Sequence, residues 1–112
     1  MTERADEAAF QAQVVELARV LGWETNHTRR SIGRGHRWTT ATSKVGWPDL
    51  VLWNPRYGGV IFAELKTDTG KVTADQEACL ASLRSAGADV RVWRPSDWPE
   101  IEATLQHREA AA

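Results

Sequence analysis

The sequence predicts one α/β domain with a central mixed four-stranded sheet flanked by helices, in the order α-β-β-β-α-β-α. Three observations predict this class. Two apolar runs, 49–53 and 60–66, flank the turn sequence NPRYGG, which is typical of a β-hairpin. Both arms are apolar at successive positions, so helices are expected to cover both faces of the sheet. Segments with helical periodicity lie before and after the hairpin.

Bulk composition is consistent with a single domain over residues 1–112. The chain has 42% hydrophobic residues, which suffices for one modest core, and a formal net charge of −1 that argues neither for nor against a polyanionic partner. Its only cysteine, Cys79, excludes an intramolecular disulfide and a Cys-rich zinc cluster. With no signal-peptide pattern and no membrane-spanning apolar run, a cytoplasmic protein is expected.

The first element is expected to be an amphipathic helix over about 6–21, ended by Gly22, followed by a short strand at 24–28. Apolar residues of the helix recur at steps of three and four, at Phe10, Val14, Leu17, Ala18 and Leu21.

A basic segment then covers about 29–46. It has no acidic residue, and its Gly, Ser and Thr content predicts a long, mobile loop. We expect it to bind the phosphates of a nucleic acid, with Trp38 stacking on an unpaired base; a solvated linker is the alternative. Its basic residues are Arg29, Arg30, Arg34, Arg37 and Lys44.

The elements after the hairpin are marked by their caps. Thr73 and Gln76 form a capping-box pattern that begins a second helix, and Gly87 ends it. A fourth strand follows around 90–92. The pattern of Asp97 and Glu100 then predicts the start of a last helix.

The hairpin register places two acids opposite each other. If Trp53 pairs with Val60, Asp49 faces Glu64, and Lys66 lies on the same side by the strand period of two. Opposed like charges are destabilising, so a positive group is expected between them. Lys66 could supply it in a purely structural pair, and two carboxylates at this spacing also suit Mg²⁺ or Mn²⁺.

Two further polar residues head the apolar faces of the flanking helices. Glu7 lies on the inward stripe of the first helix and could reach the acid pair, although the helix dipole also explains an acid there. Gln76 could do the same from the second helix, and capping accounts for it equally well.

These residues carry a family resemblance over roughly residues 7–95. Pro48-Asp49 followed by Glu64-Leu65-Lys66 resembles the PD-(D/E)xK nuclease signature, which implies a restriction-endonuclease-like core. The positions of Glu7, Gln11 and Gln76 are similar to those of the VRR-NUC family within it.

The resemblance implies a role for each site residue. Asp49 and Glu64 would bind the metal ion, joined by the Leu65 carbonyl and, through water, by Glu7. Lys66 would position or polarise the attacking water, and Gln76 would orient Lys66 or the nucleophile.

The function expected from these residues is an Mg²⁺- or Mn²⁺-dependent endonuclease that hydrolyses DNA. Resemblance to the family's phage members implies a stand-alone enzyme of bacterial or phage origin. It would form homodimers and select branched, junction or flap DNA, including DNA with single-stranded parts. The alternatives are a catalytically inactive nucleic-acid-binding module of the same fold, and an interaction subunit in which the acids only build the fold.

Overall fold

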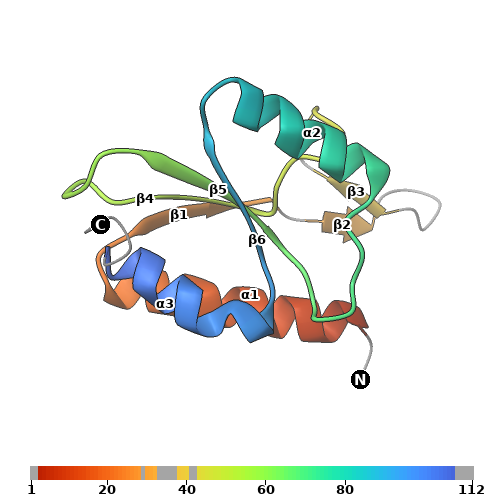
Figure 1. Ribbon diagram of the computed structural model, residues 1–112. Coiled ribbons are helices and arrows are strands. Elements are labelled where there is room, and N and C mark those ends of the chain that lie inside the picture. Colours follow the sequence, from red (N-terminus) through yellow and green to blue (C-terminus); the bar gives the residue numbers. More distant parts are fainter. Residues whose placement is uncertain (1–2, 29, 33–37, 41–42, 108–112) are drawn as a thin grey trace.

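The computed structural model describes residues 3–28, 30–32, 38–40 and 43–107 (Figure 1). Arg29, Arg34 and Arg37, three of the expected phosphate contacts, lie outside these ranges. Of the helices in the described ranges, none combines the length and the apolar character that a membrane span needs.

The central sheet has four strands in the order β1 (Glu24–His27), β4 (Leu50–Trp53), β5 (Val60–Leu65) and β6 (Asp89–Trp93). The β1–β4 and β4–β5 pairs are antiparallel, whereas β5 and β6 run parallel. The predicted α/β class and the mixed sheet are therefore confirmed.

In the described part of the chain, three helices cover the sheet in two layers. Figure 1 shows α1 (Glu3–Val20) and α3 (Trp98–Leu105) together on one face and α2 (Ala74–Ser85) on the other. A 3₁₀ turn, η2 (Pro95–Asp97), links β6 to α3. The main core lies between the sheet and the α1–α3 layer, and its buried residues include Phe10, Val14, Ala18, Trp23, Leu50, Leu52, Leu65, Trp93, Ile101 and Leu105.

The two faces of the hairpin are covered to different degrees. Toward α1 and α3 the alternate residues Leu50, Leu52, Ile61, Ala63 and Leu65 are all buried. Toward α2, by contrast, Val51, Trp53 and Phe62 are only half-buried and Val60 is exposed. The expected cover of both faces is thus complete on one side only.

The hairpin register is confirmed by its strand partners. Trp53 pairs with Val60, and the ladder continues to the pair of Leu50 and Ala63. Asp49 comes one residue before this pair and Glu64 one residue after it, which sets both acids at the same end of the hairpin.

The prediction of a continuous loop at 29–46 is wrong for six residues. Strands β2 (Arg30–Ile32) and β3 (Trp38–Thr40) pair antiparallel in a small separate sheet. Their β-branched and aromatic residues favour extended backbone, and they outweighed the glycines on which the loop prediction relied.

One helix start and one helix cap also differ from expectation. The first helix begins at Glu3, three residues before the predicted boundary. Asp97 does precede α3, but its carboxylate makes no capping bond to that helix. Its Oδ2 instead accepts a hydrogen bond from the backbone N–H of Arg94 at 2.9 Å, because the η2 turn brings that amide nearer.

Candidate active site

The candidate active site begins with Asp49, held by hydrogen bonds from both neighbouring strands. Its backbone carbonyl accepts from Thr28 N–H at 2.9 Å, beside β1. On the other side, its carboxylate Oδ2 accepts from Leu65 N–H, also at 2.9 Å. A side chain therefore continues the hairpin's hydrogen bonding just past β4, and the Asp49 carboxylate is fixed against the end of β5.

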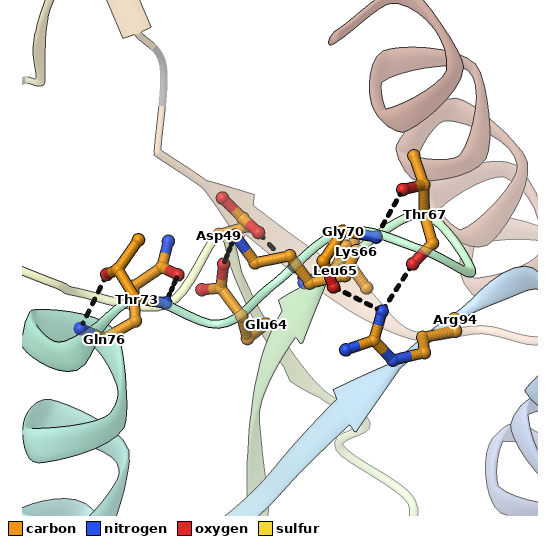
Figure 2. Close-up of polar contacts among 9 residues, drawn as sticks. All are labelled: Asp49, Glu64, Leu65, Lys66, Thr67, Gly70, Thr73, Gln76 and Arg94. Carbon is orange, nitrogen blue, oxygen red and sulfur yellow. Dashed lines mark hydrogen bonds and ion pairs between the residues drawn. The ribbon is translucent and has the colours of Figure 1, made fainter. Parts of the chain in front are cut away.

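Glu64 lies beside Asp49 and is fully buried. Neither of its carboxylate oxygens has a hydrogen-bond partner among the described residues. The Lys66 ammonium Nζ lies 3.6 Å from Glu64 Oε2, and the Lys66 side chain is 8% exposed. Figure 2 shows the lysine reaching back along the end of β5 toward both acids. A buried carboxylate without bonded partners is costly unless another group binds it.

This environment raises the pKa of Glu64 to about 8. Burial is the largest cause, followed by the negative charge of Asp49, which disfavours a second charge beside it. Lys66 opposes the rise, and Glu7 adds to it through its own charge. Near neutral pH and without a cation, the pair therefore holds a proton.

The raised pKa predicts a pH-dependent stability. A proton is bound more tightly in the folded than in the unfolded chain, so the contribution of Glu64 is full below its ordinary pKa and is lost as pH rises through about 8. We expect the metal-free protein to lose about 3 to 5 kcal/mol of unfolding free energy relative to Glu64→Gln between pH 5 and pH 9.

Urea denaturation in a chelator, repeated across this pH range, measures the difference. Glu16→Gln is the matched control, because Glu16 is exposed and its pKa is lowered by its hydrogen bond to Arg19. Parallel pH curves for wild type and Glu64→Gln would contradict the prediction.

Gln76 heads α2 and is buried. Its Oε1 accepts from Thr73 N–H at 2.9 Å, and its own N–H donates to Thr73 Oγ1 at 3.2 Å. The predicted capping box is therefore confirmed (Figure 2). The amide oxygen accepts one capping bond, and the NH₂ group of Gln76 is left for a role at the acid pair.

A close backbone contact fixes the segment before Asp49 against the start of α2. Gly46 has φ +79°, and a Cβ there would lie 2.3 Å from the Asp75 carbonyl oxygen and 2.8 Å from Gln76 N. Only glycine fits both the conformation and the space. The next residue, Trp47, packs edge-on against Phe62 with ring centroids 5.7 Å apart, on the face of β5 that carries Glu64.

We expect Gly46→Ala to lower the unfolding free energy by about 2 to 4 kcal/mol, since it adds a steric clash to backbone strain. Two other glycines separate these causes. Gly59 has φ +98° with open space around it, whereas Gly58 has open space and no such φ. Gly59→Ala should show the strain alone and Gly58→Ala neither effect. Equal stability of all three variants in urea denaturation would refute the contact.

The structure also brings two residues to the site that the sequence analysis did not select. Thr67 and Arg94 lie beside Lys66, and the Arg94 side chain donates to the Thr67 carbonyl (Figure 2). The sequence did contain a signal for Arg94, because residues that follow neighbouring parallel strands lie at the same edge of a sheet. Arg94 directly follows β6 just as Lys66 follows β5.

The other predicted site residues that the structure describes all come before Asp49 in the chain. Glu7 is half-buried on α1, and its negative charge helps to raise the pKa of Glu64. Arg30 lies on β2, Trp38 lies on β3, and Lys44 is exposed between β3 and Asp49. Within the described ranges, no three His, Cys, Asp or Glu side chains come together as a metal-binding group.

A mixed four-stranded sheet with helices on both faces, and an Asp facing a Glu-x-Lys at the hairpin's open end, defines a PD-(D/E)xK-type nuclease domain. The sequence profile described as "VRR-NUC domain" matches residues 2–97, and the chain belongs to this family. Neither the curated proteins nor the solved structures contain a significant match to the chain.

Proposed function

We propose that this protein is a divalent-metal-dependent endonuclease that hydrolyses DNA phosphodiester bonds, with selectivity for branched, junction or flap DNA. The family supports a nuclease acting on DNA. The observation that carries the metal dependence is the acid pair, in which a fully buried Glu64 faces Asp49 with neither of its oxygens hydrogen-bonded among the described residues.

The donor set fits Mg²⁺ or Mn²⁺. Both ions take hard oxygen ligands, and Mg²⁺ in enzymes is commonly held by one or two carboxylates plus waters and substrate phosphate. Asp49 and Glu64 would supply the carboxylates, the Leu65 carbonyl a third oxygen, and Glu7 a contact through water. A site of this kind does not require three converging protein side chains.

The protein's own groups then have distinct roles in hydrolysis. A bound divalent ion supplies an acidified water and positive charge for the phosphorane-like transition state. Lys66 holds an ammonium with three donors beside Glu64, suited to orienting the attacking water or a phosphoryl oxygen. Gln76, whose oxygen accepts a capping bond of α2, can contribute its NH₂ group as a hydrogen-bond donor.

The basic segment is proposed to bind the DNA. Trp38 would stack on an unpaired base, and a homodimer would bring a second active site to a branched substrate. A reducing cytoplasm, in a bacterium or a phage-infected cell, suits the buried single cysteine, Cys79. The phosphate-binding side chains in this proposal are Arg29, Arg30, Arg34, Arg37 and Lys44.

One observation favours a second candidate, a catalytically inactive nucleic-acid-binding module of the same fold. The Lys66 ammonium, 3.6 Å from Glu64 Oε2, already gives the acid pair a positive partner that is not a metal ion. Such a module would bind DNA without cutting it, and its affinity would fall steeply with salt, because phosphate contacts dominate.

Strand cleavage of labelled four-way junction, flap and linear duplex DNA decides between the two. We expect cutting of the branched substrates in Mg²⁺ or Mn²⁺ and none in excess chelator. Salt-sensitive binding without cutting in either metal would favour the inactive module. Equal cutting of linear and branched DNA would remove the proposed selectivity, and cutting that survives chelation would remove the metal dependence.

A further inference from the structure

Arg94 and Lys66 occupy equivalent places directly after two neighbouring parallel strands. Leu65, the last residue of β5, pairs with Trp93, the last residue of β6. One more backbone bond follows, from Lys66 N–H to the Trp93 carbonyl at 3.0 Å. Beyond it the chain after β5 leaves the sheet, and the regular pairing stops next to the lysine of the candidate site.

The Arg94 side chain continues the connection where the backbone pairing ends. Its Nη1 donates to the Thr67 carbonyl at 2.5 Å and to the Gly70 carbonyl at 2.6 Å. Gly70 N–H in turn donates to Thr67 Oγ1 at 2.9 Å. Residues 67–70, here called the post-β5 turn, are thus closed on themselves and held by one guanidinium (Figure 2).

Arg94 is itself held in place by the η2 turn. Its N–H donates to Asp97 Oδ2 at 2.9 Å, and its carbonyl accepts from Asp97 N–H at 2.8 Å. A second tie to the post-β5 turn runs from Ser96 N–H to Asp68 Oδ1 at 3.0 Å. The guanidinium therefore projects from a fixed backbone.

We propose that Arg94 is a positioning residue for Lys66, an inference that rests on the proposed nuclease function. The Lys66 N–H is bound to Trp93, and the carbonyl of the next residue, Thr67, is bound to Arg94. The backbone on both sides of Lys66 is fixed, and its side chain extends from there toward the acids (Figure 2). Without the guanidinium, the post-β5 turn loses both carbonyl contacts, and the ammonium is no longer confined beside Glu64.

Arg94→Met tests this role, because methionine keeps much of the apolar stem and removes both donors. In single-turnover cleavage of junction DNA we expect the maximal rate to fall about 10- to 100-fold, with apparent affinity for DNA nearly unchanged. Arg94→Lys retains a charged donor and should recover part of the rate. In a Lys66→Met background, Arg94→Met should add less than about a threefold loss, since both changes act through one group.

Arg91→Met is the matched control, because Arg91 lies on β6, three residues before Arg94, and pairs with Asp89. It should leave the rate unchanged. Thermal melting identifies a misfolded variant, and hydrogen exchange at the Gly70 amide should speed up in Arg94→Met.

The outcomes separate the inference from the function on which it rests. The positioning role would be overturned by a wild-type cleavage rate in Arg94→Met. It would also be overturned if Arg94→Met lowered the rate equally in the wild-type and Lys66→Met backgrounds. Either result would leave the nuclease function in place. A wild-type protein that does not cut DNA would overturn both.

Discussion

Replacing Asp49 by Asn is expected to lower DNA cleavage at least about 10³-fold while the fold is retained. The change removes one charge from the acid pair, yet the Asn oxygen can still accept the Leu65 N–H bond. Glu64→Gln should have the same effect on cleavage and, at pH 8 without metal, should make the protein more stable. Opposite changes in activity and stability at one residue mark a group kept for chemistry.

Two measurements check this. Single-turnover cleavage gives the rate, and calorimetric titration with Mn²⁺ should show ion uptake by wild type that is lost in both variants. Asp89→Asn, an exposed acid at the other end of the sheet, removes the same charge and should alter neither. Asp49→Ala would also leave Leu65 N–H without its acceptor, which should lower the unfolding free energy by about 1 to 3 kcal/mol. Cleavage within tenfold of wild type in Asp49→Asn would exclude Asp49 from the reaction.

The second large effect is expected for Lys66→Met, a change that keeps the length of the chain and removes its ammonium. We expect the maximal cleavage rate to fall about 10²- to 10³-fold, because the proposed mechanism loses the donor that orients the attacking water or a phosphoryl oxygen. Mn²⁺ uptake should be retained, since the two carboxylates remain. This result would distinguish the two classes of variant, with the acids needed to bind the ion and the lysine needed after it has bound.

Lys71→Met is the control for Lys66, as an exposed lysine five residues further along the chain. Its maximal rate should match wild type. Loss of Mn²⁺ uptake in Lys66→Met, or an undiminished rate, would assign the lysine to structure alone. The pKa of Glu64 should also rise further in this variant, because Lys66 is the group that lowers it.

The hairpin was predictable in detail because its signals are local and agree with one another. A turn rich in Pro and Gly fixes which residues close the strands, and the period of two then fixes every later pair. The positions of Asp49 and Glu64 at one end of the hairpin follow from Trp53 pairing with Val60, which the structure confirms. The cap of α2 was predictable for the same reason, since Thr73 and Gln76 are only three residues apart.

Contacts between distant segments were not predictable. Arg94 meets the post-β5 turn 24 and 27 residues earlier in the chain, and only the parallel crossover through α2 brings them together. The fit of Gly46 against Asp75 likewise depends on how a loop packs on a helix, which no periodicity encodes. The β2–β3 pair was missed because strands of three residues are too short to show a pattern.

The tip of the β4–β5 hairpin is a suitable place to attach a label. Residues 54–59 project from the sheet at the end away from the acids, and a side chain added at Gly58 would meet nothing within 4 Å (Figure 1). A cysteine introduced at this position could carry a fluorescent dye, since the chain's own thiol is buried. Such a label would report association with DNA from a place where it does not obstruct the proposed active site.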